Sequence, residues 1–442
     1  MISKDVFFRR IVLLICITGL LVAGCSKDDP APVTTGKVAG KVMSLSTTAA
    51  LADATVILFD ANTNSPVKTT KTNSSGDYSF DADPGNYFIK IYKQGYESVP
   101  PQGIEPVPFS IAVGQTTTQS AEMTESLLTN AGFITGKVTV GSTGEAGVLV
   151  VAELNGRAFS AISDQGGNYT IFNVPADTYT VTAYKADFSS NSAPANVTAN
   201  TGTNNINLSL TQGATGQVAG TFKVISQTTI VTPPATIDIA LVNPVTKETI
   251  PGLSQTVPYS SSLSYSFAKV PDGTYVVRAS FANDYIVIDP DYITKFGDYT
   301  VSLSGGTPTP ASVDIVATSA VLLNLPTNEM STTVPVEVTG APVFEWTAYP
   351  STSDYVIEVT DASTGSVIWG GFTDNSGTIS KNITIPSNTT SITFNSDGTA
   401  TADLVVGKVY RWRVFASKNN VQTNSWNLIA ASEDQMGLIK VK

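Results

Sequence analysis

Cys25 is the residue whose chemistry is most sharply defined by its surroundings. It follows an apolar run, residues 11–23, which begins after basic residues and ends in small ones, the layout of a signal for export. The run is shorter than the about 20 apolar residues that a membrane-spanning helix needs, so we expect cleavage rather than a permanent span. Cleavage before Cys25 would remove Cys16, the other cysteine, and leave Cys25 without a disulfide partner. Cleavage would thus leave a free thiol at an exported N-terminus, which requires an explanation.

The segment Leu21-Val22-Ala23-Gly24-Cys25 resembles the lipobox of bacterial lipoproteins, in which the cysteine is acylated and becomes the new N-terminus. Val22 stands where leucine is usual. The resemblance implies a membrane anchor through several acyl chains, each buried methylene adding about 0.8 kcal/mol of membrane affinity. The alternative is an ordinary signal peptide that happens to be followed by a cysteine.

The four residues after Cys25 are Ser26-Lys27-Asp28-Asp29. They are similar to the export signal with which one Gram-negative lineage places lipoproteins on the outer face of the outer membrane. We therefore expect a lipid-anchored protein of the cell outer membrane that faces the exterior. The alternative is a tether that is acidic only because it is solvated.

The composition excludes most catalytic chemistry. The chain has no histidine, which removes His-based triads and zincin motifs, and an acylated Cys25 leaves no cysteine nucleophile or thiolate zinc site. Residues 132–137 approach a phosphate-binding loop, but three residues instead of four separate the glycines, and Val138 replaces the magnesium-binding hydroxyl. A pair of catalytic carboxylates of the glycosidase type remains an open alternative, because such a pair is recognised by its distance in the folded protein and not by its spacing in the sequence. We expect no enzyme, no cofactor and no metal.

The net charge of the chain indicates which classes of partner it can bind. There are 25 Lys and Arg residues against 36 Asp and Glu, a net charge of −11, and no segment concentrates the basic ones. Nucleic acid is therefore not an expected partner. The membrane, reached through the lipid, is one expected partner, and glycan or other envelope proteins are the remaining candidates.

Aromatic residues near the C-terminus suggest a sugar-stacking surface, because flat rings suit the apolar faces of pyranoses. All four tryptophans lie after residue 340. Trp412 shares a strand face with Tyr410 and is expected in the core, as is Trp346. Trp369 and Trp426 remain as candidate ligand-stacking residues, with core or rim packing as the alternative.

A second dense stretch, residues 283–299, combines tyrosines and carboxylates. Its oxygens suggest calcium, but it lacks the ligand spacing of an EF-hand loop. A solvated turn between strands is the favoured interpretation.

The elements that must carry these residues are strands. Short runs of Val, Ile, Tyr and Phe alternate with Gly, Asn, Ser, Thr and Asp clusters, and beyond the export signal no long stretch has a helical period. The pattern also repeats: Pro84, Pro175 and Pro271 mark the same point of three successive copies, at a spacing that suits one sandwich domain.

The copies share a strand that reads G-x-V in the first two (residues 40–42 and 136–138) and G-x-F in the third (residues 220–222), a buried strand, a turn before a tyrosine, and a proline followed three or four residues later by a tyrosine. These residues resemble the carboxypeptidase regulatory-like family, also called transthyretin-like, over about residues 36–318. The resemblance implies seven-stranded Greek-key sandwiches that act as accessory domains without enzymatic activity. The third copy is the most diverged, with Ser264 where the turn glycine is expected.

After residue 320 the pattern changes. Residues 342–346, 355–359 and 404–414 resemble a fibronectin type III domain. The resemblance makes Trp346 the core tryptophan and Tyr410 the corner tyrosine, whose hydroxyl closes back on the preceding loop.

The sequence thus predicts an all-β chain of tandem Greek-key β-sandwich domains after a lipoprotein signal peptide. The expected segments are a signal peptide (1–24), a lipidated tether (25–35), two carboxypeptidase regulatory-like sandwiches (36–125 and 132–212), a diverged third sandwich (214–318) and a fibronectin type III-like sandwich (320–442). The expected function is non-enzymatic binding of carbohydrate or matrix at the outer-membrane surface. The alternative is a structural spacer or scaffold subunit of an envelope assembly, without a ligand of its own.

Overall fold

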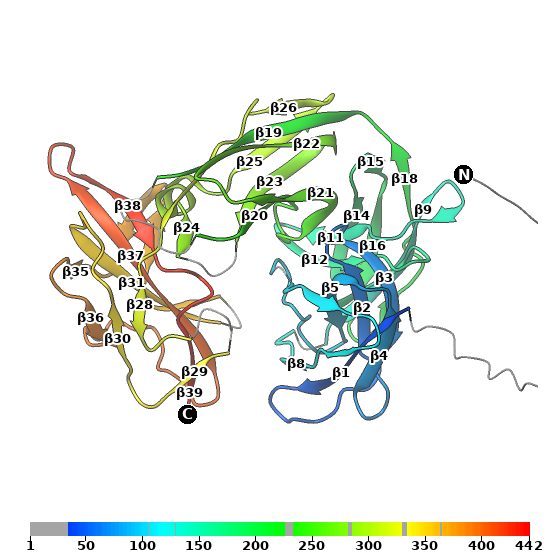
Figure 1. Ribbon diagram of the computed structural model, residues 1–442, viewed down its shortest axis with the longest axis horizontal. Coiled ribbons are helices and arrows are strands. Elements are labelled where there is room, and N and C mark those ends of the chain that lie inside the picture. Colours follow the sequence, from blue (N-terminus) through cyan, green and yellow to red (C-terminus); the bar gives the residue numbers. More distant parts are fainter. Residues whose placement is uncertain are drawn as a thin grey trace, which may run out of the picture.

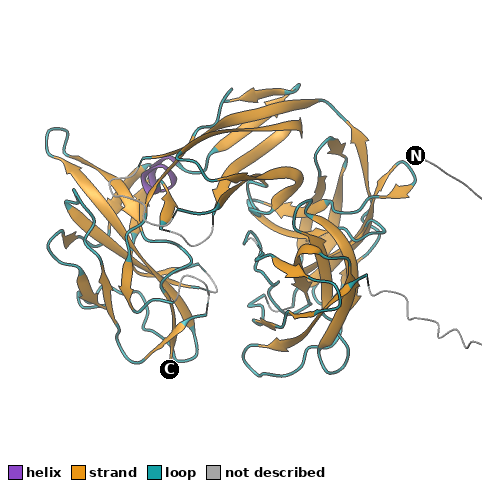
Figure 2. Cartoon of the chain, in the orientation of Figure 1, coloured by secondary structure: helices purple, strands orange, loops and turns teal. Residues whose placement is uncertain are grey.

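The computed structural model confirms the all-β fold (Figure 2). It describes residues 34–104, 106–128, 130–225, 233–281, 285–328, 334–362 and 365–442. Within these ranges the one helical element is a short π-helix, η1 (Tyr292–Phe296). None of the described residues form a helix that is long and apolar enough to cross a membrane. We call residues 36–125, 132–212, 214–318 and 320–442 the first to fourth modules.

The first module consists of two sheets. One sheet contains β1 (Gly36–Ser44), β4 (Asp77–Ala82), β7 (Thr116–Thr118) and β8 (Ala121–Met123). The other contains β2 (Thr55–Asp60), β3 (Ser65–Lys71), β5 (Gly85–Tyr92) and β6 (Phe109–Ile111). The core lies between them and includes Val38, Val56, Tyr78 and Ile91.

The second and third modules repeat this arrangement. The sheets of the second module contain β9 (Gly132–Val140), β10 (Thr143–Gly144), β13 (Asn168–Val174), β15 (Phe188–Ser190), β17 (Gly202–Thr203) and β18 (Leu208–Gln212), and β11 (Leu149–Leu154), β12 (Arg157–Ile162), β14 (Asp177–Tyr184) and β16 (Ser192–Val197). Those of the third contain β19 (Thr215–Val224), β22 (Ser262–Pro271), β24 (Ile286–Ile288) and β27 (Ile315–Ser319), and β20 (Thr236–Val242), β21 (Thr249–Pro258), β23 (Gly273–Ser280), β25 (Thr300–Ser304) and β26 (Thr307–Thr309).

One topology underlies all three modules. If the two-residue β10 is left out of the count, the first strand (β1, β9 or β19) pairs antiparallel with the fourth (β4, β13 or β22) and parallel with a strand near the module's end (β7, β18 or β27). The second strand (β2, β11 or β20) lies between the third and the fifth in the other sheet. The predicted internal repeat is confirmed by this recurring strand order.

The repeated glycine and tyrosine form one structural device. Gly40, Gly136 and Gly220 lie directly opposite Tyr78, Tyr169 and Tyr265 on the neighbouring strand. In each module the tyrosine hydroxyl donates to a backbone carbonyl of the closing segment, that of Gln119, Ile206 or Val313. A Cβ on the glycine would come within 2 Å of that same carbonyl oxygen. The glycine is therefore needed for the close approach that the tyrosine fixes.

The fourth module has a different strand order. A small sheet contains β28 (Leu323–Leu325), β30 (Val343–Trp346) and β36 (Ser391–Thr393). A larger sheet contains β29 (Val336–Val338), β31 (Asp354–Asp361), β32 (Val367–Gly370), β35 (Ile385–Pro386), β37 (Val409–Asn420), β38 (Ser425–Ala431) and β39 (Leu438–Val441), and a separate hairpin contains β33 (Phe372–Asn375) and β34 (Thr378–Lys381).

Two expectations for the fourth module are confirmed. Trp346 is 1% exposed and lies in the core with Tyr410 and Trp412. The Tyr410 hydroxyl accepts a hydrogen bond from the backbone N–H of Val405, at 2.9 Å, and so closes back on the loop before its strand.

The modules pack closely against one another. In Figure 1 the third module joins the first two, on one side, to the fourth on the other. A single apolar cluster contains residues of three modules, among them Phe88 of the first, Val151 of the second and Leu253 of the third. Lys90 of the first module forms an ion pair with Glu248 of the third at 2.5 Å, with both side chains only 11% exposed. The first three modules therefore form one packed body.

Candidate functional site

Trp369 does not form a ligand-stacking surface, so that prediction is wrong. The side chain is 1% exposed and packs against Phe344 and Phe394 in the module's core. Its Nε1 donates to Asp397 Oδ1 at 2.8 Å. The following Gly370 does not free the ring. Instead it has a φ of +67° and lets the chain approach β31, where a Cβ would come within 2.0 Å of a backbone oxygen.

Trp426 on β38 is half-buried, and other residues of the chain already cover its ring. Lys295 Nζ lies 3.9 Å from the ring centroid and Lys381 Nζ lies 4.7 Å from it. Phe372 stacks on it at 6.0 Å between centroids. Cations over an aromatic face stabilise such a packed junction. The faces of the Trp426 ring are therefore occupied by the protein's own side chains and are not free for a sugar.

In the part of the acidic stretch that the structure describes, residues 285–299, Asp289 and Asp291 do not lie in a solvated turn, so the expectation is corrected for them, whereas Asp298 is exposed. Asp291 is 9% exposed; its Oδ1 accepts from the backbone N–H of Leu428 at 2.9 Å and pairs with Lys295 at 3.0 Å. Burial raises the pKa of Asp289, while the hydrogen bond from the Asp291 N–H opposes that rise. The stretch docks the fourth module onto the third. No cluster of three or more metal-ligating side chains occurs among the described residues.

Cys25 and the residues of the export signal, Ser26, Lys27, Asp28 and Asp29, lie outside the described residues. Their roles in lipid attachment and surface display stay predictions.

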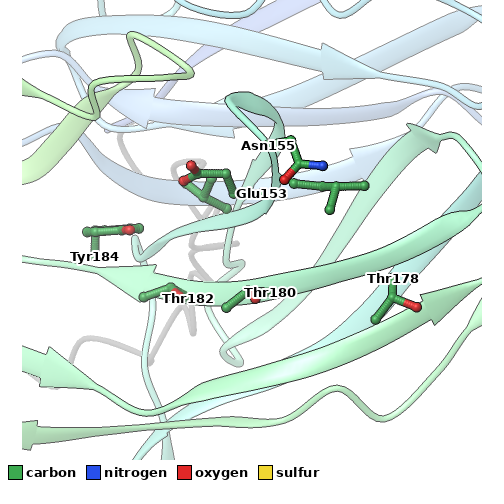
Figure 3. Close-up of a pocket in the computed structure, with 8 residues that line it drawn as sticks. Glu153, Asn155, Thr178, Thr180, Thr182 and Tyr184 are labelled. Carbon is green, nitrogen blue, oxygen red and sulfur yellow. The ribbon is translucent and has the colours of Figure 1, made fainter.

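The structure brings together a different set of residues, on the outer face of the second module. They line an open groove of about 380 Å³, drawn in Figure 3. Strand β11 and the turn after it contribute Val151, Glu153, Leu154 and Asn155, and strand β14 contributes Thr178, Thr180, Thr182 and Tyr184.

Strand alternation explains why hydroxyls line this groove. On β14 the side chains of Tyr179, Val181 and Ala183 point into the core, so Thr178, Thr180 and Thr182 share the opposite face. Thr180 lies directly across from Glu153, and Thr182 across from Val151. The equivalent strand of the first module carries Phe88 and Lys90 on this face, which the third module covers.

The electrostatics of the groove are set by one carboxylate. Glu153 is half-buried, and within the described part of the chain it makes no hydrogen bond or ion pair. Burial raises the pKa of Tyr184, the nearby Glu153 raises it further, and a hydrogen bond with Asn243 opposes the rise. None of the lining residues is basic. The groove thus offers hydrogen-bond acceptors and neutral hydroxyls, and suits a ligand that donates hydrogen bonds.

The neighbouring strand extends this polar surface. The hydroxyls of Thr182 and Ser192 lie 2.9 Å apart, and Thr178 donates to Asn196 Oδ1 at 2.7 Å. Sequence reasoning missed this face. The signal was present in the alternation Thr178-Tyr179-Thr180-Val181-Thr182, in which the face left open is polar at each position.

The described chain is a series of β-sandwich modules, and an open polar groove lies on the second of them. Residues 37–124 match the carboxypeptidase regulatory-like domain, which confirms the expectation for the first module. A search of curated proteins finds no match.

Among solved structures, the chain is similar to the Bacillus anthracis TIE protein, with 11% identity and a TM-score of 0.18, over 65% of this chain and 51% of that one. It is also similar to a streptococcal ancillary pilin (14%, TM-score 0.20, 39% of this chain and 62% of that one) and to the shaft pilin SpaA of Lactobacillus rhamnosus GG (9%, TM-score 0.19, 40% and 98%). The chain therefore spans about half to two thirds of the length of the first two. At such TM-scores these likenesses carry no argument about function.

Proposed function

We propose that this chain is a non-enzymatic lipoprotein of the outer-membrane surface whose second module binds carbohydrate. The observation that carries the proposal is the open groove on β11 and β14, where a half-buried carboxylate, which has no partner among the residues that the structure describes, faces a row of threonine hydroxyls.

The chemistry of the lining favours a neutral polyhydroxylated ligand. A carboxylate accepts hydrogen bonds from two neighbouring sugar hydroxyls, and threonine hydroxyls both donate and accept. An anionic ligand would be repelled by Glu153, because no cation lines the groove to offset it. A lipid would find too little apolar surface.

The sequence supports the location. The resemblance of the segment ending at Cys25 to a lipobox favours a lipid anchor, and the acidic residues that follow favour display on the outer face. The 418 residues that follow the signal would then hold the groove outside the cell, since 24 of the 442 residues are removed.

The strand order of the fourth module supports its assignment as a fibronectin type III-like domain. Strands β28, β30 and β36 form one sheet, and β32, β31, β37 and β39 follow one another in the facing sheet. The buried Trp346 and the hydrogen bond from Val405 to Tyr410 add to this support.

A structural scaffold without a ligand is the second candidate. The packing of the first three modules around one apolar cluster favours it, because a rigid body suits a spacer. The ion pair between Lys90 and Glu248 adds to the rigidity, since breaking a buried pair leaves an uncompensated charge.

The test is binding to a glycan array with the chain from Ser26 onward, followed by affinity measurements on Glu153→Gln. This variant keeps the shape of the side chain and removes its charge, so the affinity for the selected glycan is expected to fall about tenfold or more. Glu122→Gln on β8 of the first module, an exposed carboxylate outside the groove, is the matched control and should bind as the parent does.

If the Glu153 variant binds the glycan as tightly as the parent does, the glycan-binding site does not lie in the groove. If no glycan binds the parent and envelope proteins are captured instead in a pull-down, the scaffold becomes the better proposal.

A further inference from the structure

Three polar side chains meet beneath the β33–β34 hairpin of the fourth module. Lys381, at the end of β34, reaches Asp354 at the start of β31, with its Nζ 2.6 Å from Asp354 Oδ1. The two side chains are only 9% and 6% exposed. Such a buried pair needs further polar partners to satisfy its remaining protons and lone pairs.

Asn419, near the end of β37, is the third member. Its Nδ2 donates to Asp354 Oδ2 at 2.9 Å, and its Oδ1 lies 3.4 Å from Lys381 Nζ. One carboxylate therefore contacts the amine through one oxygen and the amide nitrogen through the other. The amine therefore lies within hydrogen-bond reach of the amide oxygen, which is one bond away from the carbon that it would attack.

The surroundings hold the amine in place. Ser417 Oγ lies 2.6 Å from Lys381 Nζ and donates to Asp354 Oδ1 at 2.7 Å. The ring of Trp426 lies on another side of the amine, 4.7 Å from ring centroid to Nζ. Asn419 itself is exposed, which gives a small leaving group a route to solvent.

We propose that Lys381 and Asn419 join in an intramolecular isopeptide bond, with Asp354 carrying the proton. Asp354 accepts a proton from the Lys381 ammonium, and the neutral Nζ attacks Cγ of Asn419. The Cγ–Nδ2 bond breaks as Asp354 returns that proton to Nδ2, the second Nζ proton passes through Asp354 to the released ammonia, and the nitrogen leaves as ammonium. One C–N bond forms and one breaks, so the step needs no oxidant, reductant or cofactor.

The bond would tie the β33–β34 hairpin covalently to β37 across the polar segment between them. A covalent link of this kind restricts the unfolded chain and so stabilises the folded one. It would also keep the hairpin in place over Trp426, at the junction with the third module. The proposal concerns the fourth module and is independent of carbohydrate binding.

The test is peptide mapping by mass spectrometry of the full purified chain. We expect a cross-linked pair of peptides containing Lys381 and Asn419, with a combined mass lower than that of the separate peptides by one ammonia. Asn419→Ala should abolish the cross-linked pair while the protein stays folded, because the residue is exposed. Asn420→Ala, an exposed amide next to it, should retain the pair.

Asp354→Asn provides the second variant, since it keeps the shape of the proton carrier and removes its basicity. It should leave both peptides separate. Recovery of the separate Lys381 and Asn419 peptides from the folded parent chain would overturn the proposal, as would a cross-linked pair that survives in Asn419→Ala.

Discussion

Substituting Trp369 with alanine tests directly whether this ring belongs to the core of the fourth module. The side chain is 1% exposed, and emptying a buried tryptophan site costs about 3–5 kcal/mol of stability. The lost hydrogen bond to Asp397 adds little, because that exposed carboxylate regains water. We therefore expect the loss of packing to set the magnitude.

Hydrogen exchange measured by mass spectrometry suits this test, because it reports on each module separately. At 1.4 kcal/mol for each factor of ten, protection of peptides from β31, β32 and β37 should fall about 10²- to 10⁴-fold. Peptides from β1 to β5 of the first module should exchange as in the parent.

Val421→Ala is the control for Trp369→Ala, because Val421 lies in the β37–β38 turn and is 92% exposed. It should leave protection unchanged. A change of less than tenfold in the β31 and β32 peptides of Trp369→Ala would refute the core assignment and restore the ring as a candidate for ligand stacking.

Two further predictions concern the N-terminus. Cys25→Ala should abolish membrane retention, because it removes the predicted acylation site; cell fractionation after metabolic labelling with a fatty acid measures this, and unchanged labelling of the variant would contradict the lipoprotein assignment. Replacing residues 27–29 with alanines should leave the protein in the membrane but protect it from protease added to intact cells. Equal cleavage of this variant and the parent would favour the solvated tether.

Local patterns in the sequence were sufficient for the fold class and for several core residues. Strand alternation placed Tyr410 and Trp412 together in the core, and the repeated glycine and tyrosine predicted the modules whose topology recurs. These predictions succeed because period-2 alternation and turn chemistry act over a few residues. The contact of Gly136 with a carbonyl some 70 residues away was not predictable from such patterns.

Most residues of the candidate site could not be predicted from the sequence. The sequence suggests both Trp369 and Trp426 as exposed aromatics, yet one lies in the core and the other in a junction between modules. Nothing in the neighbours of Glu153 along the chain distinguishes this carboxylate from the others. Its position depends on the pairing of β11 with β14 and on the face that the third module leaves open.

The sequence by itself determined that the chain is built from strands, that three modules share one pattern, and which residues alternate toward each core. Only the tertiary structure decided what covers the outer faces: Phe88 and Lys90 are buried by the third module, whereas Thr178 and Thr180 stay open. The physical reason is that alternation separates the two faces of a strand but carries no record of the surface that packs on the second face. That contact forms between segments more than 100 residues apart, as Lys90 and Glu248 illustrate.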